Sequence, residues 1–211
     1  HLVGKYLFDR KIDREIDTLL GETATGPREA ITEEDLEGLP APVQRYLRFA
    51  GVVGRYPIRS ARVTHQGDIR GGADSRWMPF DAVQYYSAAP PAFVWHADVK
   101  AAPLISMDVR DYYLRGRGDI TGRLASVIPI VHQRGPEIDQ GSGLRLLSEL
   151  VWVPTAFLEP YIEWEAIDDR QARVTMQHWD GEISAIFGFA EDGRVQIIVG
   201  DRFRSTNGQY Q

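Results

Sequence analysis

The stretch LRLLSELVWVPTAFL, from Leu144 to Leu158, decides the fold that we expect for this chain. It has helical spacing and is apolar on nearly every face, with one carboxylate, Glu149, set inside it. A surface helix keeps one polar side, so a helix that is apolar all round is covered by other elements on several sides. We therefore expect residues 144–158 to form a buried central helix.

The composition indicates a folded protein and excludes several classes of function. Of the 211 residues, 43% are hydrophobic and 10% aromatic, which supports a sizeable core in one large sheet-rich domain. The net charge of −6 argues against nucleic acid as a partner, because proteins that bind phosphate backbones have a basic surface. The absence of cysteine excludes disulfides, thiolate metal sites and cysteine nucleophiles.

On both sides of the central segment the sequence has the composition and period of β-strands. A first strand is expected from Ile58, where the period changes to alternation. Aromatic segments at 77–87 and 93–100 are bounded by proline, another strand is expected at 105–115, and residues 120–131 are expected to continue the sheet. We interpret Gly116-x-Gly118 as a bulge. After the central segment, tight-turn sequences predict a meander of four strands. The expected fold class is α+β: a large curved antiparallel sheet, an incomplete barrel, packed on the buried helix.

The chain before this sheet is expected to be helical. Residues 1–57 are interpreted as a helical segment packed on the main domain, which spans 58–211 and contains the central helix. An amphipathic helix with Tyr6 and Leu20 on its apolar face is expected to end before Gly21. Thr32 and Asp35 have capping-box spacing. A second helix, residues 43–50, is expected to stop at Gly51.

Glu149 is the first candidate for a functional residue. A carboxylate in an apolar helix is costly unless it is paired or reaches water. Two interpretations are open: an acid that faces a cavity, or a structural ion pair with Arg145 one turn earlier. Trp152 lies on nearly the same side of the helix, where it fills the core or contacts a ligand.

A second candidate is the charged and aromatic strand around Asp111. Strand alternation places Asp111, Tyr113 and Arg115 on one face, where they could bind an anionic head group. A solvated ladder of cross-strand charges is the alternative.

The sequence names no metal ligands, cofactor or catalytic residues. The histidines His65, His96, His132 and His178 are scattered without the short spacing that metal sites usually show, so we expect no metal site. No Gly-x-Ser-x-Gly motif provides a serine nucleophile.

Three motifs together resemble an uncharacterised bacterial family of unknown function. They are Leu39-Pro40-x-x-Val43-x-x-Tyr46-Leu47, Gly116-x-Gly118, and Arg145-x-Leu147-x-Glu149-x-x-Trp152-x-Pro154-Thr155-Ala156. The resemblance runs from about Leu39 to near Phe203 and implies no activity or catalytic residue.

The expected architecture is also similar to that of bacterial lipoprotein carriers and related lipid-binding proteins, which hold acyl chains between a sheet and helices. This resemblance implies an apolar cavity, whereas ordinary core packing is the alternative role of the same side chains. The candidates to line such a cavity are Trp77, Phe80, Tyr85, Phe93, Trp95, Val151 and Trp152.

Three functions therefore remain open for this chain. The first is binding of a hydrophobic or amphiphilic small molecule in a cavity between sheet and helix. The second is an enzyme that uses a cavity carboxylate, Glu149 or Asp111, and the third is an envelope-associated interaction protein. The sequence does not decide between cytoplasm and envelope, and proximity to a membrane would have to come from segments outside it.

Overall fold

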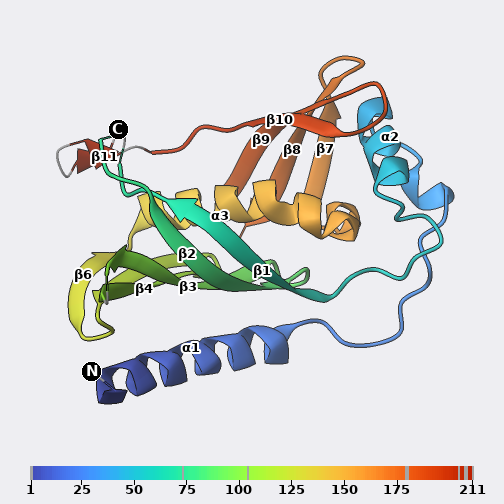
Figure 1. Cartoon of the computed structure of the whole chain (residues 1–211). Coiled ribbons are helices and arrows are strands. Elements are labelled where there is room, and N and C mark those ends of the chain that lie inside the picture. The colour runs from blue at the N-terminus through green and yellow to red at the C-terminus, as the bar shows by residue number, and fades with distance from the viewer. Residues whose placement is uncertain are drawn as a thin grey trace. The chain divides into compact units, whose positions relative to one another are not determined.

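The computed structural model describes residues 2–72, 74–103, 105–178, 181–203, 205–206 and 209–210, and its fold is α+β (Figure 1). Two compact units divide the chain. The first contains His1–Thr23 and Ser60–Ser142, and the second contains Ala24–Arg59 and Gly143–Gln211. None of the described helices combines the length and the apolar character that crossing a bilayer requires.

The first unit contains a curved antiparallel sheet whose six strands follow one another in sequence order (Figure 1). Its presence confirms the expected large, open sheet, since neither this sheet nor the four-stranded one closes into a barrel. The strands are β1 (Ser60–Ile69), β2 (Met78–Ser87), β3 (Ala92–Ala102), β4 (Ile105–Leu114), β5 (Arg117–Leu124) and β6 (Ile128–Gln133).

Helix α1 (Leu2–Glu22) lies across one face of this sheet. Its side chains Phe8, Ile12 and Leu19 are buried in one apolar cluster with Val94 of β3 and Leu114 of β4. The expected apolar face was partly wrong, because Tyr6 is 60% exposed and Leu20 is 41% exposed. The helix also continues through Gly21, where we expected it to end. The φ angle of Gly21 is not positive, and a Cβ atom added there would have no neighbour within 4 Å.

Two hairpin turns differ from the sequence prediction. Arg115 and Gly116 both have positive φ and join β4 to β5, as a two-residue type I′ turn requires, so the expected bulge is wrong. Ala125 and Ser126 also have positive φ, and the turn around them divides the single strand expected at 120–131 into β5 and β6. Neither Ala nor Ser favours this conformation, so the sequence contains no signal for the second turn.

Helix α3 (Pro136–Glu149) begins in the first unit, where its residues Ile138 and Ser142 pack on the sheet at Gly118 and Asp111. Gly118 explains how the helix approaches β5 so closely. A Cβ at this position would lie 2.7 Å from the carbonyl oxygen of Ile138 and 2.8 Å from Ser142 Oγ. Glycine at 118 is therefore required by packing, not by its backbone angles.

The second unit contains the expected meander, with strand order β10-β9-β8-β7. Its strands are β7 (Ile162–Ala166), β8 (Gln171–His178), β9 (Gly181–Phe189) and β10 (Val195–Val199). Helix α2 (Ala41–Phe49) contacts β8 and β9 and buries Val43, Tyr46 and Leu47. A short 3-10 helix, η1 (Glu34–Leu36), precedes it, and β11 (Ser205–Thr206) pairs with β12 (Gln209–Tyr210).

The central segment is less regular than expected. Helix α3 ends at Glu149, and two 3-10 helices follow, η2 (Leu150–Trp152) and η3 (Pro154–Leu158). Pro154 has no N–H for a continuing helix, and Val153 leaves the helical region at φ −129° and ψ 59°. Most side chains here are buried, but Trp152 is 49% exposed, so its expected burial is wrong.

Candidate functional site

Five of the predicted ligand-binding residues lie on the sheet face of the first unit that α1 does not cover. Trp95 pairs with Asp111 across β3 and β4, and Phe93 pairs with Tyr113. The Phe93 and Tyr113 rings are stacked with centroids 6.3 Å apart, and Phe80 meets Trp95 edge to face at 6.1 Å. Phe93 and Tyr113 have no exposed surface, so this arrangement forms a packed aromatic layer.

The structure separates three other candidates from that layer. Tyr85 packs on the opposite face, against the cluster of α1, and its hydroxyl oxygen accepts a hydrogen bond from Arg62. Trp77 is 59% exposed, with the guanidinium of Arg70 4.6 Å from its ring centroid. Arg115 lies in the β4–β5 turn, beyond the strand alternation, and binds Glu22 of α1.

Glu149 forms an ion pair with Arg145, with Arg145 Nε 2.8 Å from Glu149 Oε1. The two residues are one helical turn apart and both are partly buried. This is the structural alternative considered for Glu149. The enzymatic hypothesis named two carboxylates, Glu149 and Asp111. The ion pair with Arg145 weakens the case for Glu149 as a catalytic acid.

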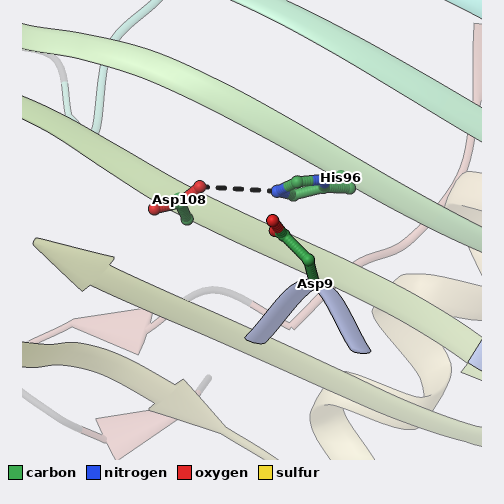
Figure 2. A group of neighbouring side chains, drawn as sticks. All are labelled: Asp9, His96 and Asp108. Atoms are coloured by element: carbon green, nitrogen blue, oxygen red, sulfur yellow. Dashed lines mark ion pairs between the residues drawn. The ribbon is translucent and has the colours of Figure 1, made fainter. Parts of the chain in front are cut away.

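A cluster that the sequence did not indicate lies on the α1 side of the first unit. Asp9 of α1, His96 of β3 and Asp108 of β4 each direct one potential ligand atom toward the others, all within 4.8 Å of one another (Figure 2). Asp108 is only 1% exposed, and its Oδ1 lies 3.6 Å from His96 Nε2. The only usable sequence signal was the alternation that places His96 and Asp108 on one face of paired strands.

Two further side chains hold the carboxylates of this cluster. Lys5 Nζ lies 3.2 Å from Asp9 Oδ1 and 3.4 Å from Asp108 Oδ1. Ser126 Oγ donates a hydrogen bond of 2.5 Å to the other oxygen of Asp108. Burial lowers the pKa of His96, although Asp108 acts in the opposite direction. The neutral imidazole that results at neutral pH is the form that binds metal ions.

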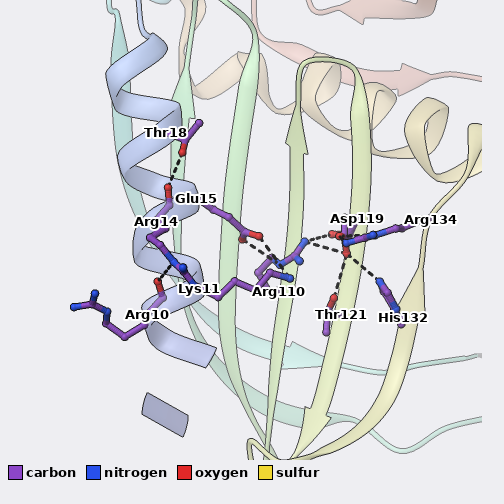
Figure 3. A network of polar contacts seen from close by, with 10 residues as sticks. All are labelled: Arg10, Lys11, Arg14, Glu15, Thr18, Arg110, Asp119, Thr121, His132 and Arg134. Carbon is purple, nitrogen blue, oxygen red and sulfur yellow. Dashed lines mark hydrogen bonds and ion pairs between the residues drawn. The ribbon is translucent and has the colours of Figure 1, made fainter. Parts of the chain in front are cut away.

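A fully buried arginine lies next to this cluster on β4. Figure 3 shows Arg110 between Glu15 of α1 and Asp119 of β5. Its Nη1 donates to the Asp119 carbonyl oxygen at 2.7 Å and lies 3.1 Å from the Asp119 carboxylate, while the Tyr112 ring centroid is 5.0 Å from its guanidinium carbon. The same carboxylate also binds Arg134 and accepts from Thr121. This network connects α1 to the sheet.

The pKa values of two carboxyl groups in this network are shifted in opposite directions. Burial raises the pKa of Glu15, and Arg110 and Lys11 only partly oppose this effect. Burial acts in the same sense on Asp119, but there the hydrogen bond from Arg134 and the charge of Arg110 outweigh it, so the pKa of Asp119 is lowered. Asp119 is thus the firmly ionised partner of Arg110.

The second unit contains an open cavity of about 560 Å³. Its floor includes three buried residues, Ile31, Thr155 and Glu159, which are at most 8% exposed. One guanidinium and four carboxylates contribute to its lining, together with apolar side chains. The full lining is Arg28, Glu29, Ala30, Ile31, Thr32, Glu34, Asp35, Pro57, Thr155, Leu158 and Glu159.

Backbone hydrogen bonds fix the walls of this cavity. Ile31 donates to the Arg55 carbonyl at 2.9 Å and accepts from Gly54 at 2.7 Å. Ile58 donates to Thr155 Oγ1 at 2.8 Å. At the rim, the Asp35 carboxylate accepts from the backbone N–H of Thr32 at 2.7 Å, which is the contact that their spacing predicted.

At the floor, Glu159 forms an ion pair with Arg28, whose Nη2 lies 3.4 Å from Glu159 Oε2. Glu159 is 8% exposed, so its carboxylate is compensated inside the unit. Sequence reasoning missed this pair because 131 positions separate its members. It also missed the cavity, to which the Pro154-Thr155-Ala156 motif contributes Thr155.

The two longer motifs meet in the second unit. The Tyr46 ring packs edge to face on Phe157, with centroids 5.9 Å apart, and its hydroxyl donates to the Val151 carbonyl at 3.3 Å. Burial raises the pKa of Tyr46, which therefore remains protonated. The motif residues thus hold α2 against the segment that forms the cavity floor.

No curated protein and no solved structure shows significant similarity to the chain. A family model described as a family of unknown function (DUF6544) matches residues 29–211. The match covers all of the second-unit cavity except Arg28, and it leaves α1 outside. It agrees with the membership that the three motifs led us to expect. The chain belongs to this family of unknown function, DUF6544.

Proposed function

We propose that the protein binds a small amphiphilic molecule with a cationic group in the second-unit cavity. The observation that carries this proposal is a hollow of about 560 Å³ lined by apolar side chains and by three exposed carboxylates, Glu29, Glu34 and Asp35. This volume is in the range of about 300 to 1,000 Å³ that small-molecule sites occupy. Such sites combine apolar walls with a few polar groups that orient the guest.

The charged side chains of the lining determine which sign of charge the ligand should have. The rim carboxylates are Glu29, Glu34 and Asp35, which line the cavity and are exposed, whereas Arg28 is already paired with Glu159. A positive group entering the cavity is therefore attracted by the rim, whereas an anion is repelled. An ammonium head group fits this field.

The remaining walls suit an alkyl or aromatic tail. Ile31, Pro57 and Leu158 offer apolar surface beside the carboxylates. Thr155 Oγ1 accepts the Ile58 hydrogen bond, so its own hydroxyl hydrogen can be donated to a guest. The proposal keeps the ligand class expected from the sequence and assigns it to a different place, without using the aromatic layer of the first unit.

The test compares three octyl compounds that differ only in head group: octyltrimethylammonium, octyl sulfate and octyl glucoside. We expect the ammonium compound to raise the melting temperature increasingly as its concentration exceeds its Kd, and to bind at least tenfold more tightly than the sulfate. Replacing octyl with butyl should weaken binding, because less apolar surface is buried. Equal binding of the sulfate, or no binding of the ammonium compound, would contradict the proposal.

Variants assign the binding to this cavity. The double variant Glu29→Gln with Glu34→Gln removes two rim charges and should weaken ammonium binding at least threefold. The double variant Glu33→Gln with Glu37→Gln is the matched control, because these two carboxylates are exposed on the same segment and do not line the cavity. If both variants lost affinity equally, the binding would be a nonspecific effect of net charge.

A further inference from the structure

The Asp9, His96 and Asp108 cluster has the donor set of a divalent metal site. It offers one imidazole nitrogen and two carboxylate oxygens from three different elements, α1, β3 and β4. Imidazole with carboxylates suits zinc, manganese, cobalt and non-haem iron, which prefer such mixed nitrogen and oxygen ligands. The cluster lies in the first unit, and its inference is independent of the cavity proposed above.

The separation of His96 and Asp108 is close to the one that a metal ion needs, and all three ligand atoms lie within 4.8 Å of one another. A metal about 2.0 to 2.2 Å from each ligand holds tetrahedral ligand atoms roughly 3.4 Å apart. His96 Nε2 and Asp108 Oδ1 are 3.6 Å apart, near this value and beyond a normal hydrogen bond. Figure 2 shows the Asp9 carboxylate and the His96 ring nitrogen directed toward the same space beside Asp108.

Two observations indicate that this space is suited to a cation. Among the described residues, the buried Nε2 atom of His96 has no hydrogen-bond partner, although it points toward two carboxylates. The ammonium of Lys5 already lies within 3.4 Å of both Asp9 and Asp108. The fold thus brings a positive charge to these oxygens from a side chain that is 40% exposed and has room to withdraw.

Ser126 supports the same interpretation. Its hydroxyl binds Asp108 Oδ2, which leaves Oδ1 directed toward His96 and Lys5. Metal-binding carboxylates are commonly oriented by such outer hydrogen bonds. We propose that Asp9, His96 and Asp108 bind a divalent transition-metal ion in exchange for the Lys5 ammonium.

The experiment uses the full chain after treatment with a chelator, with Zn²⁺ titrated by calorimetry and Co²⁺ followed by its visible absorbance. We expect one ion per chain. His96→Asn and Asp9→Asn should each lower the affinity at least tenfold, and Lys5→Met should raise it, because the competing ammonium is gone. Circular dichroism and thermal melting verify that each variant is folded, and Asp9→Asn changes a side chain that is 41% exposed.

His132→Asn is the matched control, since His132 also lies beside an aspartate on this sheet, with Nε2 3.9 Å from Asp119 Oδ1. Its metal affinity should equal that of the unchanged protein. Absence of binding in both the unchanged protein and Lys5→Met would overturn the site, as would full affinity in folded His96→Asn. An unchanged affinity in Lys5→Met would overturn the exchange.

Discussion

Arg110 Nε lies 3.2 Å from Glu15 Oε2, so an arginine with no exposed surface on β4 is ion-paired to helix α1. On its other side the same guanidinium contacts Asp119. Removing one member of a buried ion pair is far more destabilising than the net value of the pair, because the remaining charge stays buried. The stability of the first unit should therefore depend on this network.

Asp119→Asn should lower the free energy of unfolding by about 3 kcal/mol or more at pH 7, since Arg110 and Arg134 both lose a charged partner. Urea unfolding measures the change. Asp68→Asn, at an exposed position of β1, should change the stability by no more than about 0.5 kcal/mol. Similar losses in the two variants would contradict the role of the network.

The effect of Asp119→Asn should also depend on pH. The pKa of Asp119 is lowered in the folded protein, so its ionised form adds stability that is fully present above the unfolded pKa, about 3.9. As the pH falls below that value and through the lowered folded pKa, this contribution is lost. The difference between the two proteins should be constant from pH 7 to about pH 4 and narrow below it. If the difference in free energy of unfolding already narrowed between pH 7 and pH 5, a group other than Asp119 would be responsible for the pH dependence.

Gly118→Ala should destabilise the protein by about 1 to 3 kcal/mol, because the added methyl group meets the backbone of α3 at 2.7 Å. Thermal and urea unfolding measure the loss. Gly71→Ala is the control, since a Cβ at Gly71 has no neighbour within 4 Å. A Gly118→Ala variant as stable as this control would show that α3 does not pack on β5 in this way.

Phe157→Ala should cost about 3 to 5 kcal/mol, because Phe157 is 1% exposed and contacts the rings of Tyr46 and Trp164. Trp152→Ala should cost only about 1 to 2 kcal/mol, because about half of its surface is already in water. Chemical denaturation of both variants provides the comparison. Equal losses would mean that Trp152 is a core residue.

Tyr46→Phe removes the hydrogen bond to Val151 while keeping the ring contacts, and should cost about 0.5 to 1.5 kcal/mol. Tyr56→Phe, at a position that is 72% exposed, serves as the control. The expected difference between the two free energies of unfolding disappears if the Tyr46 hydroxyl makes no buried hydrogen bond.

The strand pattern could be predicted because it depends on local chemistry. Asp192-Gly193 marks the turn between β9 and β10, and Gly193 has the positive φ that this sequence favours. The turn at Ala125 and Ser126 also requires positive φ angles, but it contains none of the residues that favour them, such as glycine or asparagine. The sequence therefore predicted one strand where two exist.

The candidate sites depended on distant pairings that no local pattern reveals. Asp9, His96 and Asp108 meet only because α1 crosses β3 and β4, and Arg28 meets Glu159 only inside the second unit. Asp111 and Tyr113 were correctly placed on one face, because alternation along a strand is local. Arg115 was not, because its turn ends that alternation.

Each unit is assembled from two separate stretches of the chain, and this arrangement affects how the protein forms during synthesis. Helix α2 cannot form its contacts with β8 and β9 until those strands are synthesised, more than a hundred residues later. The ribosome finishes the six-stranded sheet first, so α1 can cover it while the nascent α2 is still without its docking partners. The order of translation therefore makes every residue of the first unit available for folding before the second unit has all of its own.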